Sequence, residues 1–564
     1  MKAKFLRKSR LFSIQQRRKP FWGSLTAVFQ TCCIALLLLT VSFADAAKVE
    51  DFMPQESIFY GKLQNIDEIY SEIETSEDWE KALGILTATP SWQEAQEALA
   101  MLQVTIGTDL LGIIETVGYR TAVGIWKDEL NNLQIGIVIH SGGNLARLQQ
   151  LTKIVEGLMG MDSNNTLHLD AGVYQRVRYN AMERFDLVIK YGFVDEFLVV
   201  GANEGSFEKL MDTYRTDMPS IQENQKFTKT LKRIGSGEAI IFANVPDALS
   251  IPIGLDESLQ KRLSIFQSVY GRLNLLEIGP FLQVAAQFNS DLPENEIGMF
   301  LKEGQSLKTL NALSDKDDLF VAVAPEIVES LWEFAPTDAD PDAISFFEGL
   351  LNLNLEDVIV GLTGELALSI PDFRLFDLDA LSGFRFEFDG AIALDAGDVE
   401  TGGCLIFNPS NRIKWDQIGN SLSNLQNASV SQMEHKGATV SAISSNIYHT
   451  EVDGLFLIGF AEEQVYTVID QIKEKKRPSY LKQLPKTPTA FAQLNLARTL
   501  EIQKGPPPAD KLIVDAKEIA RIIAWMSVKD DGALLEATLS QKETALQALA
   551  KLVPFFVWNI EEQE

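Results

Sequence analysis

Alternating acids near the middle of the chain are the side chains best spaced for metal chemistry. Asp338, Asp340 and Asp342 follow the spacing with which a calcium loop supplies its oxygen ligands. Ala343, however, stands where that loop needs glycine for a sharp turn, and Gly349 stands where it needs a bidentate glutamate. We therefore interpret this run as an acidic segment that caps a helix beginning near Ala343, and we predict no metal site.

The other reactive side chains are dispersed. The four histidines of the chain are His140, His168, His435 and His449. They lack the spacing of metal ligands, and we interpret each as packed or solvated. Cys404 lies in the apolar run 401–407 with no histidine nearby in sequence, so we interpret it as a small hydrophobic strand residue rather than a nucleophile. The motifs of nucleophile elbows, phosphate loops and zinc proteases are also absent, and the sequence predicts no catalytic, cofactor-binding or metal-binding residue.

Some acids do recur in a regular way. Asp195, Glu204 and Asp212 correspond to Asp453, Glu462 and Asp470 at a constant shift of 258 residues. The apolar strand pattern that stops at Gly201 likewise recurs with its stop at Gly459. Recurrence of polar and apolar positions in one register favours a tandem duplication. The alternative is two unrelated domains that share a strand-then-helix order.

The elements that would position these residues predict an α+β fold. Strand patterns often follow one another without an intervening helix, which favours antiparallel sheets over a doubly wound fold. We expect two tandem related domains, each a mainly antiparallel sheet with packed helices. The first copy would span 47–305 and the second 312–556, with a link at 306–311 and an acidic tail at 557–564.

Hairpins and helices are predicted inside each copy. The alternating runs 167–179 and 185–193 predict one hairpin, and each copy is predicted to close with another, at 272–290 and 521–541. In the last hairpin, Asp531-Gly532 indicates a tight turn, because glycine tolerates a positive φ. Helices are expected over 326–351 and 412–425 in the second copy.

The second copy also carries an insertion, at about 371–403, which has no counterpart in the first. It holds six aspartates and several phenylalanines, and Phe384, Phe386 and Phe388 alternate so that their rings share one face of a predicted strand. Core packing and a partner-binding face are both compatible with this pattern.

The N-terminal 46 residues are expected to be a signal peptide. Eight basic residues precede an apolar stretch at 25–43, and Ala44-Asp45-Ala46 then predicts cleavage before Ala47. The alternative is an uncleaved membrane anchor. Cleavage would leave Cys404 as the one cysteine of the mature chain, so no intramolecular disulfide could form.

Charge limits the partners. The 564-residue chain has a formal charge of −28, and the expected signal peptide has a net charge of +7, so the mature chain would carry −35. Such a charge excludes nucleic acid as a partner and disfavours an anionic membrane surface. Contact with a membrane is expected only through the N-terminal segment, if that segment is retained.

Three stretches resemble a bacterial family of exported proteins that is known only as a domain of unknown function. They are Met53 to Tyr60, Gly107 to Val123, and Phe197 to Asn203, and weaker counterparts occur in the second copy. The resemblance implies export to the periplasm or the cell exterior, and it implies no activity, cofactor or site residue.

These observations favour a non-enzymatic envelope protein that binds or scaffolds an unknown protein or apolar ligand. Two alternatives stay open: a hydrolase built on scattered carboxylates, and a carrier of an apolar ligand held between sheet and helices. Clustered carboxylates in one deep cleft would favour the first alternative, and a large dry pocket would favour the second.

Overall fold

The computed structural model describes most of the chain after residue 47. The described residues are 48–89, 119–161, 165–251, 263–289, 307–325, 364–371, 403–417, 431–442, 448–504 and 512–561, apart from single positions within them, together with the strands 384–388 and 392–396 and a few isolated residues. They form helices and one large sheet in which every described strand pair is antiparallel, as expected for an α+β protein. Within this part of the chain, no helix is both long and apolar enough to cross a membrane.

Ten strands come from the first half of the chain. They are β1 (Phe59–Gln64), β2 (Arg120–Lys127), β3 (Leu133–His140), β4 (Thr166–Tyr174), β5 (Val177–Arg184), β6 (Leu187–Val194), β7 (Phe197–Ala202), β8 (Ala239–Asn244), β9 (Phe266–Leu273) and β10 (Leu282–Phe288). Their hydrogen-bonded order is β4-β5-β6-β7-β3-β2-β1-β8-β9-β10.

Ten more strands of this sheet come from the second half. They are β11 (Leu319–Val323), β12 (Gly364–Ile370), β15 (Cys404–Pro409), β16 (Gln432–His435), β17 (Ala438–Ala442), β18 (Tyr448–Val452), β19 (Leu455–Gly459), β20 (Ala490–Leu494), β21 (Ile522–Lys529) and β22 (Gly532–Leu539). Their order is β16-β17-β18-β19-β15-β12-β11-β20-β21-β22. Strand by strand, this order repeats that of the first half.

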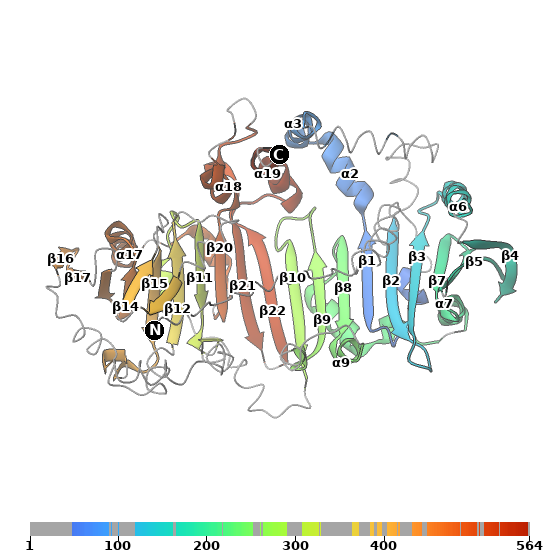
Figure 1. Cartoon of the computed structure of the whole chain (residues 1–564), viewed down its shortest axis with the longest axis horizontal. Coiled ribbons are helices and arrows are strands. Elements are labelled where there is room, and N and C mark those ends of the chain that lie inside the picture. Colours follow the sequence, from blue (N-terminus) through green and yellow to red (C-terminus); the bar gives the residue numbers. More distant parts are fainter. Residues whose placement is uncertain are drawn as a thin grey trace, which may run out of the picture.

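The two sets of strands meet edge to edge. β10 pairs with β22, so that Gln283 lies opposite Glu536, and one twenty-stranded sheet runs through both halves (Figure 1). The sequence predicted a sheet in each half but gave no sign of this joint.

Each half buries an apolar core on the same face of the sheet. In the first half, η1 (Val49–Phe52), α7 (Ser206–Arg215), η2 (Ile221–Glu223) and α8 (Gln225–Ile234) supply residues that pack with Tyr60, Phe242 and Tyr270. In the second half, η3 (Lys308–Ala312), α17 (Glu462–Glu474) and η4 (Ser479–Gln483) pack with Phe320 and Phe491. Burial of one such aromatic side chain stabilises the fold by about 1.5–3 kcal/mol.

The glycines predicted to end a strand lie where a helix packs back onto that strand. A Cβ at Gly201 in β7 would lie 2.2 Å from the backbone nitrogen of Phe207 in α7. A Cβ at Gly459 in β19 would lie 2.2 Å from Cγ2 of Val465 in α17. Both positions therefore need glycine for close approach.

The expected link at 306–311 contributes to a core. Within it, Leu307 and Leu310 are buried among the core residues of the second half, and residues 308–311 lie in η3. η3 precedes β11 as η1 precedes β1.

Other helices cover one end of the sheet. α2 (Ile66–Thr75), α3 (Glu77–Thr87), α18 (Leu496–Lys504) and α19 (Ala545–Glu561) gather at the same end of the strands (Figure 1). The Trp79 indole in α3 donates a hydrogen bond of 3.1 Å to the Leu546 carbonyl in α19, so the last helix packs on the first half. α19 continues to Glu561 with Val557 buried, so residues 557–561 of the expected tail are helical.

Three further helices lie elsewhere on the sheet. α6 (Leu145–Met159) packs on β3 and β7 through Leu148 and Leu151. The other two are the short helices α9 (Val245–Leu249) and η6 (Ala516–Glu518).

Two hairpin predictions were wrong in their limits. The alternating run 167–179 contains a turn at Gln175 and Arg176, both with positive φ, which separates β4 from β5. The closing hairpin of the first half begins at Phe266 rather than 272, since β9 pairs with β10 along its whole length. Alternation continues through the first error because the two-residue turn at Gln175 and Arg176 preserves the period of two.

Several predicted segments lie wholly or partly outside the described residues. These are the signal peptide 1–46, the acidic run 338–342, the helix at 326–351 and most of the insertion 371–403. Within the insertion, β13 (Phe384–Phe388) pairs with β14 (Ile392–Ala396), which confirms the predicted strand. The predicted helix 412–425 is described only near its start, at 412–417.

Candidate functional site

The recurring acids hold turns and helices together. Asp195 and Asp453 begin the turns that precede β7 and β19, and both have a φ of 51°. Asp195 accepts a hydrogen bond of 2.8 Å from the Tyr214 hydroxyl in α7, and Asp453 accepts one of 2.9 Å from the Lys473 ammonium in α17. Each acid therefore fixes a hairpin turn to the helix that follows it.

A second pair of acids holds the outer hairpins. Asp212 in α7 accepts hydrogen bonds from the hydroxyl of Tyr174 and the amide of Gln175, at the end of β4. Asp470 in α17 contacts the Nε2 atom of His435 at 2.6 Å and the ammonium of Lys436 at 3.0 Å, at the end of β16. Burial favours a higher pKa for Asp470, but its hydrogen bonds to His435 and Lys436 outweigh burial and lower the pKa.

The histidines lie at four separate places, as predicted. The His140 ring accepts a hydrogen bond of 2.9 Å from the Gly142 amide and packs edge-on against Phe197, and burial lowers its pKa. His168 is half-exposed beside Glu183 in the outer hairpin. His449 lies in β18, where burial lowers its pKa. Within the described part of the chain, no three histidine, cysteine or acidic side chains are grouped so that they could hold a metal ion.

Cys404 is a buried residue of β15, which confirms its interpretation as a small hydrophobic side chain. It lies in the second core opposite Gly459, and burial raises the pKa of its thiol far above the usual range. Such a thiol is a poor nucleophile, because the thiolate is the reactive form.

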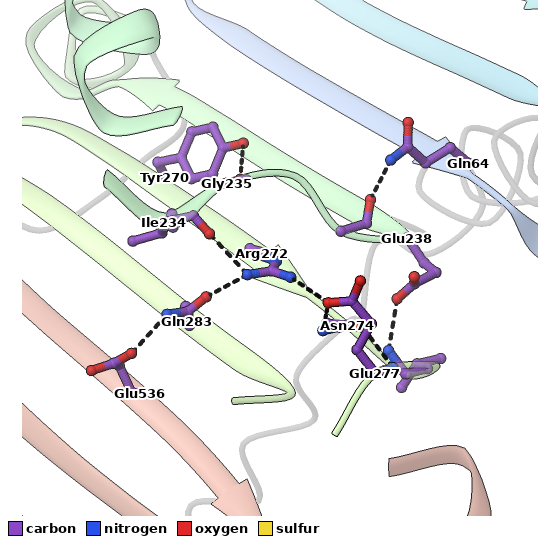
Figure 2. A network of polar contacts seen from close by, with 12 residues as sticks. Gln64, Ile234, Gly235, Glu238, Tyr270, Arg272, Asn274, Glu277, Gln283 and Glu536 are labelled. Atoms are coloured by element: carbon purple, nitrogen blue, oxygen red, sulfur yellow. Dashed lines mark hydrogen bonds and ion pairs between the residues drawn. The ribbon is translucent and has the colours of Figure 1, made fainter. Parts of the chain in front are cut away.

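A network of polar contacts crosses the joint between the halves (Figure 2). Arg272 in β9 donates hydrogen bonds of 2.9 Å to the Ile234 carbonyl and to Oε1 of Gln283 in β10. The Gln283 amide donates one of 2.7 Å to Oε1 of Glu536 in β22, and the Trp525 indole in β21 donates one of 3.1 Å to Oε2 of the same carboxylate. These four side chains form one cross-strand row on the core face.

The edges of this network are also occupied. Arg272 forms an ion pair of 3.5 Å with Glu277, and Asn274 donates a hydrogen bond to the same carboxylate (Figure 2). The Tyr270 hydroxyl donates to the Gly235 carbonyl, and burial raises the pKa of Tyr270 far above its usual range. Glu277 and Glu536 thus accept hydrogen bonds from neighbouring side chains and Glu238 accepts one from the Leu275 amide, so the arrangement joins strands instead of presenting a general base.

Contacts beside the network reinforce the joint. Lys229 in α8 forms an ion pair of 2.7 Å with Asp531, in the turn before β22, and its hydrogen bond lowers the pKa of Asp531. A Cβ at Gly532 would lie 2.1 Å from the Ala286 carbonyl oxygen in β10. Gly532 is therefore required for close approach across the joint, and the predicted positive φ is wrong because this residue does not have one.

The opposite face of the central strands is apolar and partly exposed. We define the central apolar face as the residues of β1, β8, β9, β10, β22, β21, β20 and β11 that alternate with the core residues. They are Phe59, Gly61, Leu63, Ala239, Ile241, Ala243, Val269, Gly271, Leu273, Leu282, Val284, Ala286, Ala533, Leu535, Ala537, Ala524, Met526, Val528, Ala490, Ala492, Val321 and Val323. Ile241 is 53% exposed and Leu535 is 39% exposed.

This face reverses the usual polarity of an antiparallel sheet, in which the side away from the core is polar. Here Arg272, Gln283 and Glu536 lie on the core side, and the residues of the central apolar face have no charged or hydrogen-bonding side chain, although Gln267 at the start of β9 alternates with the core in the same way. Sequence reasoning missed the face. The signal was present in β8 and β22, where apolar residues occupy consecutive positions instead of alternating with polar ones.

Comparisons with known proteins give little help. No family model matches the chain, and no curated protein matches it. The solved structure of TP0453 in crystal form III is similar to 46% of this chain and 89% of that chain, with 9% identity and a TM-score of 0.24. Crystal form I of TP0453 gives 10% identity and a TM-score of 0.22 over 46% of this chain and 85% of that chain. TM-scores this low carry no argument about fold or function.

Proposed function

We propose that this chain is an exported, non-enzymatic binding or scaffolding module that recognises its partner through the central apolar face. The observation that carries the proposal is the polarity of the central strands, which turn polar side chains toward the core and alkyl side chains outward. Exposed apolar patches of this kind mark interaction sites in soluble proteins.

Two tandem related domains are part of the proposal. The repeated strand order supports duplication, as do Gly201 and Gly459 at the ends of corresponding strands. The acids Asp212 and Asp470 give further support, because each holds the turn of an outer hairpin from the helix after β7 or β19. Unrelated domains would have no reason to share such long-range contacts.

A binding role fits the polar groups better than catalysis does. Four of the recurring acids, the aspartates, accept hydrogen bonds from neighbouring tyrosine, glutamine, lysine or histidine side chains, and Cys404 is buried. A hydrolase needs a carboxylate or nucleophile that converges with a second group beside a bound substrate.

Export rests on the N-terminal segment and on the family resemblance. The order of cationic stretch, apolar stretch and small residues before Ala47 is that of a signal peptide. We therefore place the mature chain in the periplasm or outside the cell, and an N-terminal sequence by mass spectrometry tests this placement.

A neutral apolar dye tests the binding surface. At nanomolar concentrations of the mature chain, Nile red fluorescence should rise on binding, and the double variant I241K/L535K should bind the dye at least tenfold more weakly. The control is I413K, because Ile413 is 73% exposed and lies in another region, after β15. Equal dye binding by all three chains, with equal thermal melts, would exclude the central apolar face as the binding surface.

A further inference from the structure

We infer that the partner of the central apolar face is a second copy of this chain, packed face to face. This inference rests on the proposed function, because it names the occupant of the same surface. Three properties of the face support it. They are its composition, its area, and the same order of strands on the two sides of the joint between β10 and β22.

The composition suits sheet-on-sheet packing. The middle row of the face runs through Ile241, Gly271, Val284, Leu535, Met526 and Ala490 on six adjacent strands. A Cβ at Gly271 would have no neighbour closer than 4.0 Å, so the row has an open position at Gly271 between the larger side chains of Ile241 and Val284. Inner faces of packed sheets interdigitate in this way, with the sheets about 10 Å apart.

The area matches what a stable dimer needs. Eight strands at a spacing of about 4.8 Å give a width of about 38 Å, and five residues at about 3.4 Å give a height of about 17 Å. The projected area of the face is therefore about 650 Å². The accessible surface of its side chains is larger than this projection, and each partner in a standard interface buries roughly 800 Å².

The likeness of the two sides favours a copy over an unlike partner. The joint between β10 and β22 lies at the middle of the face, and the strands beside it follow the same order, β9, β8, β1 and β21, β20, β11. Both sides of the joint are apolar, although equivalent positions differ in side-chain size, as Gly271 and Met526 do, and such a patch can pack against its own copy in an isologous contact. Because the face carries no charge, the strong net charge of each chain does not have to be buried in the contact.

The borders of the face leave room for a flat partner. Leu63 belongs to the apolar cluster of α6, and Ile522, at the upper end of β21, belongs to a cluster with Ala548 of α19. Between these helices, β8, β9, β10, β22 and β21 lie side by side, with α9 at the lower ends of β8 and β9 (Figure 1).

Sedimentation equilibrium of the mature chain tests the inference. From nanomolar to micromolar concentrations, the wild-type chain should pass from monomer to dimer, whereas L535K should raise the dissociation constant of the dimer at least tenfold. L535M, which keeps an apolar side chain, and I413K, which lies elsewhere, should both dimerise like the wild type. Thermal melts should show that all variants are folded.

The outcomes separate this inference from the function on which it rests. Nile red bound per chain should fall as the chain concentration rises, because the second copy covers the dye site. If every variant is monomeric and the dye still binds to the face, the dimer is wrong and the occupant is a small apolar ligand. A dimer that persists unchanged in L535K also overturns the inference. Loss of both dye binding and dimerisation from the wild type would overturn the proposed function as well.

Discussion

Ser57 and Asp317 each lie two residues before the first strand of their half. Each closes a turn by bonding the backbone of the residue three positions earlier, but one does so as a donor and the other as an acceptor. In the first half, the Ser57 hydroxyl donates a hydrogen bond of 2.7 Å to the carbonyl of Pro54. In the second half, the Asp317 carboxylate accepts one of 2.9 Å from the amide of Ser314. Proline has no amide hydrogen, so only a donor can close the first turn, whereas Ser314 offers one and permits an acceptor.

The comparison extends to the outer hairpins. Asp212 is bound by a tyrosine and a glutamine in the first half, and Asp470 by a histidine and a lysine in the second. The geometry is thus retained while neutral partners are replaced by ionisable ones. The second half should consequently respond to pH at positions where the first does not.

The largest difference in unfolding free energy between matching substitutions is expected at the two strand-end glycines, Gly201 and Gly459. G201A places a methyl group against the backbone of Phe207, which cannot move alone, and should lower the free energy of unfolding by about 3 kcal/mol or more. G459A meets only the Val465 side chain and should cost about 1–2 kcal/mol. Denaturant unfolding measures both. The double variant G459A/V465A should recover part of the loss, and equal costs at the two glycines would contradict the comparison.

The next effect concerns the buried Asp317. Burial raises its pKa to about 6, which outweighs its hydrogen bonds to the Ser314 amide and the Ser369 hydroxyl. A raised pKa means that folding favours the protonated form, so stability should fall as pH rises from about 4 to about 6, by at most about 3 kcal/mol. D317N should remove this slope, and S57A, altered at the matching site, should keep it. An unchanged slope in D317N would show that other groups produce it.

A smaller effect is expected at the outer hairpins. D470N should cost about 1 kcal/mol at neutral pH, because it loses its ionic contacts with His435 and Lys436 on a half-exposed surface. The lowered pKa of Asp470 means that this contribution is present above pH 4 and is lost as the carboxylate becomes protonated below it. The difference in unfolding free energy between wild type and D470N should therefore vanish in acid, and a constant difference from pH 7 to pH 2 would refute the assignment.

Reductant is expected to leave the thermal stability of the protein unchanged. Cys404 is buried and, in the mature chain, has no second cysteine with which to pair. Thermal melts of the mature chain with and without a thiol reductant should coincide. A shift of several degrees would indicate a disulfide between chains and would require Cys404 to leave the core.

The recurrence of acids and glycines predicted much of the local structure. Gly201 and Gly459 end corresponding strands, and Asp195 and Asp453 begin the turns before those strands. These features could be predicted because turn chemistry and strand alternation act over a few residues. The strand limit near Gln175 could not, since apolar alternation continues across a two-residue turn.

The sequence by itself determined the α+β class, the tight turn between β21 and β22 and the hydrophobic character of Cys404, because each depends on nearby residues or on composition. Only the tertiary structure decided that β10 pairs with β22, that α19 packs on α3, and that Gly532 must lack a side chain. It also decided that Arg272, Gln283 and Glu536 face the core while Ile241 and Leu535 face outward. The face of a strand residue is set by the register of pairing and by what covers the sheet, and those long-range contacts leave no local pattern in the chain.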